Sequence, residues 1–198
     1  MPLLSKIKEY TDILTFREID QIYLTLISDT FPWFSIGGKT VNDFWHDAEK
    51  DEFTKEYLQL VHQFNLLDGT PNSDYSGMTD HILKRFLEAA GYKLKKLYKV
   101  KANFQPRVET FGENYYNTPH VDSADPHYVL LYYPHTTDGK TRIFNKTEQD
   151  KKIKYDIIKE TSPEAGKFLF FNGDYFHSGA HPMTSESRMV INFNFEIE

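Results

Sequence analysis

Apolar side chains in the first half of the chain recur at the spacing of amphipathic helices. The clearest stripe covers residues 16–29, and further helical regions are indicated at about residues 42–61 and from Thr79 onward. Residues 68–73 separate the last two regions as a loop of turn-forming side chains. The apolar positions of the three stripes are Ile19, Ile22, Tyr23, Leu26 and Ile27; Trp45, Phe53, Tyr57, Leu58 and Val61; and Ile82, Leu83, Phe86 and Leu87.

The second half of the chain instead shows the two-residue alternation of β-strands. Upstream, an apolar strand-like run at residues 167–171 leads into turn-forming residues at 172–174. Near the end of the chain, one face of a predicted strand carries Arg188, Val190, Asn192 and Asn194, and the other carries Met189, Ile191, Phe193 and Phe195. A mostly polar face on an interior strand indicates a barrel that lines a site.

A group of five lysines falls within residues 93–101. The pattern predicts a strand whose solvated outer face carries Lys99 and Lys101 and whose inner face carries Tyr98 and Val100. An anion-binding strip is the alternative interpretation of the same lysines. We favour the solvated face, because runs of like charge usually lie in water.

Length and composition limit the class of protein. A chain of 198 residues, of which 39% are hydrophobic, can bury one substantial core without crosslinks. The absence of cysteine excludes disulfides, thiolate zinc sites and cysteine nucleophiles, and it is compatible with a reducing compartment. The net charge of −6 argues against a nucleic-acid partner. Without a recognisable signal or membrane-spanning segment, we expect a soluble cytoplasmic protein with no membrane partner.

His120, Asp122 and His177 are the candidate metal ligands. Residues i and i+2 of a strand share one side, so His120 and Asp122 can reach one ion while Val121 packs on the other face. A distant strand and turn would deliver His177 as the third ligand. Two imidazoles and one carboxylate form the facial triad of non-haem Fe(II) oxygenases. His181 is the alternative third ligand, and we prefer His177 because it directly follows the strand and turn.

Four ordered segments extend this pattern: PHVD, LYYPHTTDGKTRIF, GKFLFFNGDYFHSGAHP and SRMVINFNF. Together they resemble the 2-oxoglutarate- and Fe(II)-dependent oxygenase superfamily, and most closely its prolyl-4-hydroxylase-like branch, over about residues 99–196. The resemblance implies a mainly β fold with α-helices, namely a double-stranded β-helix (jelly roll) with supporting N-terminal helices. We therefore expect a single oxygenase domain at 1–198, with a helical N-terminal part at about 1–92 and a jelly-roll core at about 93–198.

The resemblance also implies roles for individual residues. It places the catalytic iron on His120, Asp122 and His177, and the distal carboxylate of 2-oxoglutarate on Arg188 and Tyr133. Relatives often carry Arg-x-Ser on the last strand, whereas this chain has Val190 at the serine position. The usual hydroxyl partner is therefore missing, and a second contact to the cosubstrate must come from elsewhere.

The implied activity is that of a non-haem Fe(II)- and 2-oxoglutarate-dependent dioxygenase, with Fe(II) as cofactor, 2-oxoglutarate as cosubstrate, and molecular oxygen and an unidentified substrate as partners. Hydroxylation is the expected outcome, because halogenating relatives replace the carboxylate of Asp122 with a small residue. A protein or peptide side chain is the favoured substrate on resemblance alone. The alternatives are a cupin-like jelly-roll metalloprotein of another chemistry, which needs no arginine like Arg188, and a non-catalytic binding module.

Overall fold

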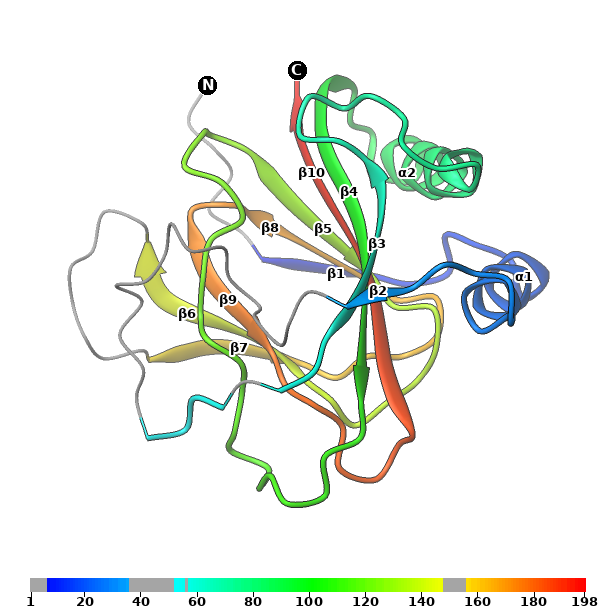
Figure 1. Ribbon diagram of the computed structural model, residues 1–198. Helices are drawn as coiled ribbons and strands as arrows, with labels where there is room; N and C mark the ends of the chain where they lie inside the picture. Colours follow the sequence, from blue (N-terminus) through cyan, green and yellow to red (C-terminus); the bar gives the residue numbers. More distant parts are fainter. Residues whose placement is uncertain (1–6, 36–51, 56, 148–155) are drawn as a thin grey trace.

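The computed structural model describes residues 7–35, 52–55, 57–147 and 156–198 (Figure 1). Its strands form two antiparallel sheets, a seven-stranded sheet in the order β1-β8-β5-β10-β4-β3-β2 and a three-stranded sheet in the order β7-β6-β9. The large sheet contains β1 (Lys8–Tyr10), β2 (Phe34–Ser35), β3 (Leu60–Asn65), β4 (Leu94–Pro106), β5 (Tyr128–Tyr132), β8 (Phe168–Asn172) and β10 (Ser187–Ile197). The small sheet contains β6 (Thr141–Thr147), β7 (Ile157–Thr161) and β9 (Tyr175–Gly179).

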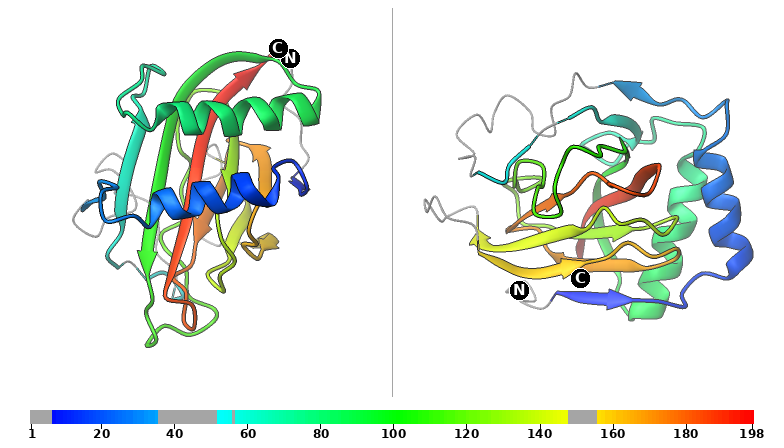
Figure 2. Two further views of the ribbon diagram at one scale, coloured as in Figure 1. Left: turned by 90° about the vertical axis from the view of Figure 1, so that its right-hand side faces the viewer. Right: turned by 90° about the horizontal axis from the view of Figure 1, so that it is seen from below.

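Two helices, α1 (Phe16–Leu26) and α2 (Ser76–Ala90), lie across one face of the large sheet (Figure 2). Their apolar stripes pack on the outward side chains of β4, β5, β8 and β10 in one core cluster. The side chains that the helices bury are Ile22 and Leu26 from α1, and Ile82, Leu83, Phe86 and Leu87 from α2. No helix in the described segments combines the length and apolar character needed to cross a bilayer.

The first and third predicted helices are confirmed, with different ends. Helix α1 stops at Leu26, three residues before the expected end, and α2 begins at Ser76 rather than at Thr79. A capping box fixes the start of α1, because the Thr15 hydroxyl accepts from the backbone N–H of Glu18 while the Glu18 carboxylate accepts from the backbone N–H of Thr15. The N-cap position of α2 makes no side-chain hydrogen bond, so the sequence carried no capping signal there.

The predicted helix at residues 42–61 is wrong at its C-terminal end. Val61 lies in β3, which pairs antiparallel with β4 and extends the large sheet. Much of the expected stripe, including Trp45, lies outside the described residues. The N-terminal part is also less helical than expected, because β1, β2 and β3 form the two outer parts of the large sheet. At Val61, long-range pairing with β4 supplies the hydrogen bonds that local periodicity assigns to a helix.

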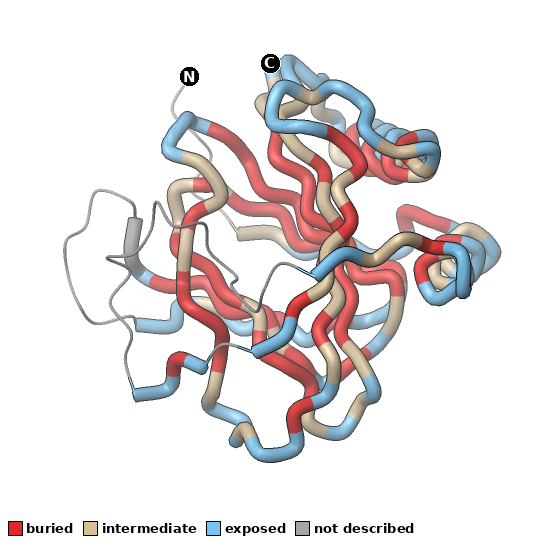
Figure 3. The backbone as a smooth tube through the Cα atoms, in the orientation of Figure 1, coloured by how far each residue is buried: buried red, intermediate tan, exposed pale blue. Residues whose placement is uncertain are grey.

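Strand β10 is buried on both faces and lies between β4 and β5 (Figure 3). The predicted alternation is confirmed, because Met189, Ile191, Phe193 and Phe195 pack in the core beneath the helices. The opposite face looks toward the small sheet, where Arg188, Val190 and Asn192 line an internal chamber. The two sheets therefore enclose a polar space whose wall is built largely from β4, β9 and β10.

Glu18 makes the stability of α1 sensitive to acid. Hydrogen bonds from the Thr15 hydroxyl and backbone, followed by the contact with His81, lower the pKa of the Glu18 carboxyl from 4.5 to about 2. Because the folded pKa lies below the ordinary value, this stabilisation is complete above about pH 4.5 and is lost as the pH falls through about 2. We expect Glu18→Gln to lower the free energy of unfolding at pH 7 but not at pH 2, measured by urea denaturation.

The matched control is Glu88→Gln on the exposed face of α2, where the carboxylate lies 3.9 Å from Lys84 Nζ. Exposed pairs of this kind contribute little, so this variant should follow the wild-type stability across the same pH series. An equal loss in both variants at pH 7 would show that Glu18 has no special role in the cap.

Candidate metal centre and chamber

His120 and His177 face each other across an antiparallel backbone bridge. The bridge joins β9 of the small sheet to the segment that connects β4 to β5. The N–H of His120 donates to the carbonyl of His177 at 3.1 Å, and the N–H of His177 donates to the carbonyl of His120 at 2.9 Å. The two imidazole centroids lie 4.9 Å apart. Val121 points the other way into a small apolar cluster with Tyr116, so alternation returns Asp122 to the side of the histidines.

Backbone carbonyls fix the orientation of both imidazoles. His120 Nδ1 lies 3.0 Å from the carbonyl of Thr118, and His177 Nδ1 lies 3.2 Å from the carbonyl of Tyr175. Since a carbonyl only accepts, Nδ1 carries the hydrogen and Nε2 presents its lone pair. Burial lowers the pKa of His120 and lowers that of His177 to about 4. Both rings are therefore neutral at pH 7 and can serve as nitrogen ligands.

Asp122 supplies an ionised carboxylate to the same group. Burial alone would raise its pKa, but the positive charge of Lys99 opposes this effect, and the pKa lies well below the usual value. The amide nitrogens of Asn192 and Asn194 donate to Oδ2 at 2.8 and 2.9 Å. These contacts from β10 hold the carboxylate in place, and its side chain is only 4% exposed.

The ligand atoms of His120, Asp122 and His177 all lie within 4.8 Å of one another. Two neutral imidazole nitrogens and one carboxylate oxygen suit a divalent transition metal and leave half of an octahedron open. His181 does not join this group. Its Nδ1 hydrogen-bonds to the carbonyl of Pro106 at 3.0 Å, and its ring contacts Tyr57 and Phe111.

Arg188 lies toward the other end of the chamber with all of its hydrogen bonds directed at neutral acceptors. Nε donates to the carbonyl of Gly139 at 2.8 Å, Nη1 to Oε1 of Gln105 at 2.7 Å, and Nη2 to the hydroxyl of Thr141 at 2.8 Å. Tyr133 donates its hydroxyl to the same Thr141 oxygen at 2.8 Å, and burial raises the pKa of Tyr133 to about 12. Arg188 therefore has no carboxylate partner within the described residues.

Two glycines allow the backbone to approach Arg188. A Cβ atom on Gly139 would lie 2.7 Å from Arg188 Cδ and 2.6 Å from the carbonyl oxygen of Ala180. A Cβ atom on Gly179 would lie 2.8 Å from Nη1 of the guanidinium. The Asp138-Gly139 turn is held by the Asp138 carboxylate, which accepts from three successive backbone N–H groups at Met183, Thr184 and Ser185. These close contacts explain the glycine in the turn before β6.

The expected orientation of the lysines on β4 is wrong. Lys99 and Lys101 stand opposite Asn194 and Asn192 of β10, and paired residues of adjacent strands point to the same side. Lys101 consequently lines the chamber, and Lys99 Nζ lies 3.9 Å from Asp122 Oδ1. The other face of β4 is not a solvated surface, because helices cover it and it carries buried residues such as Val100.

Several residues of the chamber were missed in the sequence. Thr141 begins β6, two residues after Gly139. This position directly after the turn is the signal in the sequence that could have identified it. Asn192 and Asn194 were expected on the polar face, but their contacts with Asp122 depend on the packing of one sheet against the other. Gln105 carried no local signal, because its role follows from its pairing with Arg188.

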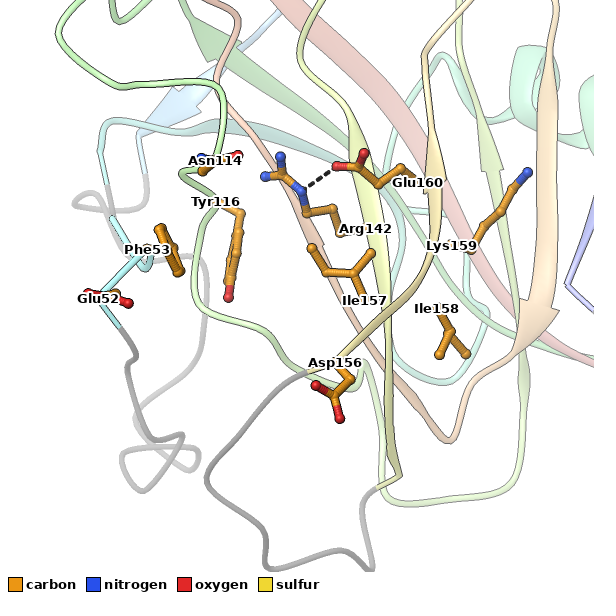
Figure 4. A pocket seen from close by; sticks show the side chains of 10 residues that line it. All are labelled: Glu52, Phe53, Asn114, Tyr116, Arg142, Asp156, Ile157, Ile158, Lys159 and Glu160. Carbon is orange, nitrogen blue, oxygen red and sulfur yellow. Dashed lines mark hydrogen bonds and ion pairs between the residues drawn. The ribbon is translucent and has the colours of Figure 1, made fainter.

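A second hollow, of about 1010 Å³, lies outside the small sheet (Figure 4). Arg142 lies in its wall and donates to Glu160 at 2.7 Å and to the carbonyls of Tyr115 and Glu113. Arg142 precedes the buried Ile143 on β6, and successive side chains of a strand face opposite sides. This hollow therefore lies on the other face of the sheet from the histidines, and its size does not make it the chemical site.

No family model matches this chain, and no curated protein matches its sequence. Solved structures do match. A prolyl-4-hydroxylase from Pseudomonas putida has a TM-score of 0.52 at 12% identity, covering 96% of this chain and 92% of that one. An oxidoreductase of the 2OG-Fe(II) oxygenase family from Burkholderia pseudomallei has a TM-score of 0.60 at 10% identity, covering 96% and 84%.

The non-haem α-ketoglutarate-dependent epimerase SnoN from nogalamycin biosynthesis gives a TM-score of 0.61 at 12% identity, covering 96% of this chain and 78% of that one. Together these likenesses show that the chain has the fold of the 2-oxoglutarate- and Fe(II)-dependent oxygenases. The expected fold, a mainly β jelly roll with supporting N-terminal helices, is confirmed, and the described residues contain two such helices.

The converging ligand atoms predict binding of Co(II), whose visible absorption reports its coordination. We expect His177→Ala to weaken Co(II) binding by more than about 100-fold, because even outer contacts to a metal ligand are worth about 10- to 100-fold. His181→Ala is the matched control and should leave the titration unchanged. Loss of Co(II) binding in His181→Ala, with binding retained in His177→Ala, would show that His181 and not His177 is the third ligand.

Proposed function

We propose that this protein is a non-haem Fe(II)- and 2-oxoglutarate-dependent dioxygenase that hydroxylates its substrate. The observation that carries the proposal is the presence, in one chamber, of a His120-Asp122-His177 group and a buried guanidinium that has no carboxylate partner among the described residues. Fe(II) together with 2-oxoglutarate and molecular oxygen supplies an oxidant for unreactive C–H bonds and releases succinate and carbon dioxide. A cupin-like metalloprotein or a binding module would leave the placement of Arg188 unexplained.

The three proposed ligands fit Fe(II) by charge and by geometry. Two neutral imidazoles and one carboxylate leave a divalent ion with net positive charge, so the site favours an anionic chelator such as the keto-carboxylate end of 2-oxoglutarate. The carbonyls of Thr118 and Tyr175 orient the imidazoles, and the amides of Asn192 and Asn194 orient the carboxylate of Asp122. The chain thus holds the ligands in position before the metal arrives.

Arg188 and Thr141 are the proposed partners of the distal carboxylate. The guanidinium is permanently charged and forked, which suits a carboxylate. Thr141 already accepts hydrogen bonds from Arg188 and from Tyr133, so its own hydrogen remains to be donated into the chamber that it lines. Thr141 would therefore supply the hydroxyl that Val190 lacks, and Tyr133 would position Thr141 from behind.

The fold does not identify the substrate of this proposed reaction. The matched structures include a prolyl-4-hydroxylase and an epimerase from a biosynthetic route, so the architecture supports either a peptide side chain or a small molecule. Molecular oxygen is the second partner that the reaction requires. The cytoplasmic location expected from the sequence stays a prediction.

Anaerobic addition of Fe(II) and 2-oxoglutarate should produce a weak visible charge-transfer band, and air should then release succinate. We expect His177→Ala to abolish both signals, because the metal loses a ligand, while His181→Ala retains them. Absorption spectroscopy and quantification of succinate provide the measurements. Tight Fe(II) binding with neither band nor succinate would favour a metalloprotein of another chemistry.

Thr141→Val removes one hydroxyl from the proposed carboxylate site while conserving its shape. We expect the anaerobic Kd for 2-oxoglutarate to rise about tenfold, in line with the loss of about 1.5 kcal/mol from one hydrogen bond to a charged group. Arg188→Lys keeps the charge but loses the fork and should weaken binding at least as much. Thr184→Val on the surface is the control, and unchanged binding in Thr141→Val would remove this residue from the site.

A further inference from the structure

Two lysines on β4 place their ammonium groups beside the proposed metal centre. Lys101 is opposite Asn192 and lines the chamber, and Lys99 is opposite Asn194 with Nζ 3.9 Å from Asp122 Oδ1. No carboxylate within the described residues forms an ion pair with Lys101. A charge enclosed in a protein is costly without a partner, so an unpaired lysine in a chamber wall calls for a function.

The charges of the chamber do not balance once its proposed contents are in place. A divalent metal and dianionic 2-oxoglutarate cancel each other, and the single negative charge of Asp122 offsets only one of the three cations Arg188, Lys99 and Lys101. Two positive charges then remain, and no further acidic residue is among the described side chains that line the chamber. The missing negative charge must come from solvent ions or from the substrate.

The two lysines occupy a different part of the chamber from the distal carboxylate site. Arg188 and Asn192 are four residues apart on β10, which corresponds to roughly 13 Å along a strand. Lys101 therefore lies at the metal end and beyond the reach of a carboxylate bound to Arg188. The side chain of Lys99 points to the same side of β4 as Lys101 and is 15% exposed. The strand becomes more exposed from there toward Lys95 and Lys96.

We propose that Lys101, assisted by Lys99, binds an anionic group of the substrate, so that the oxidised molecule carries a carboxylate or a phosphate near the reacting carbon. The reference to a reacting carbon rests on the proposed dioxygenase function, whereas anion binding by the lysines does not. A lysine ammonium is a compact point charge with three donors, and it accepts either kind of anion. A protonated lysine or an arginine as the substrate group would be repelled.

The test uses matched pairs of probes that differ by one charge: aspartate and asparagine, glutamate and glutamine, phosphoserine and serine, each free and within an alanine-flanked tripeptide. Zn(II)-loaded protein with saturating 2-oxoglutarate cannot turn over, because Zn(II) has no redox chemistry. Calorimetric titration then gives the Kd of each probe. The same titrations on metal-free protein make the readout independent of the metal site, and therefore of the proposed function.

We expect at least one anionic probe to bind more tightly than its neutral partner, and the free and tripeptide forms to distinguish a small molecule from a peptide side chain. Lys101→Gln should raise the Kd of that probe by about 10- to 100-fold, because it removes one charged hydrogen bond. Lys101→Arg keeps the positive charge and should retain the binding. Lys96→Gln, on the exposed part of the same strand, is the matched control and should leave the Kd unchanged.

Three results would overturn the proposal. They are equal affinity for charged and neutral probes, no binding of any anionic probe, and a Lys101→Gln variant in which only the Kd of 2-oxoglutarate changes. Retained Zn(II) affinity in Lys101→Gln shows that the variant is folded. Failure of the dioxygenase proposal has a separate signature, because succinate release would be absent while the lysine-dependent preference for anions persisted.

Discussion

The candidate site depends on the backbone bridge between His120 and His177. Two hydrogen bonds hold these distant segments in antiparallel register, which sets the imidazoles side by side. Alternation along the first segment then buries Val121 in an apolar cluster and returns Asp122 toward β10, where Asn192 and Asn194 hold its carboxylate. The proposed ligands therefore come from β9 and from the segment between β4 and β5, and β10 of the large sheet holds the carboxylate among them.

Strand β10 shows how the fold accommodates a polar interior. One face carries large apolar side chains into the core beneath α1 and α2, and the other carries polar groups into the chamber. Buried polar groups are tolerated when they find partners. Arg188 finds three acceptors, and Asn192 and Asn194 donate to Asp122. The close approach of Gly139 and Gly179 completes this arrangement by leaving room for the guanidinium.

Local sequence patterns predicted the helices and strands that keep the same face against the core along their whole length. The alternation around Arg188 and the helical stripe ending at Leu26 are examples, because one face of each packs on the core throughout. Patterns failed where a distant partner decides the outcome. Val61 joins a strand because β4 is available for pairing, and Lys101 faces inward because the helices cover the opposite face of its sheet. Thr141 meets its hydrogen-bond partners only in the folded chain, where Arg188 of β10 and Tyr133, just after β5, both donate to its hydroxyl.

The buried cations of the described residues differ in how their charge is neutralised. Arg142 bonds to the carboxylate of Glu160 and to two carbonyls, so it is neutralised within the fold and secures the loop around Tyr115. Arg188 has only neutral acceptors, and Lys101 has no ion-pair partner within the described residues. Both of these unneutralised cations belong to the chamber that contains the histidines. The fold thus pairs Arg142 with a carboxylate, whereas Arg188 and Lys101 form no ion pair within the described residues, and this excess of positive charge supports the proposal that an anion binds at each end of the chamber.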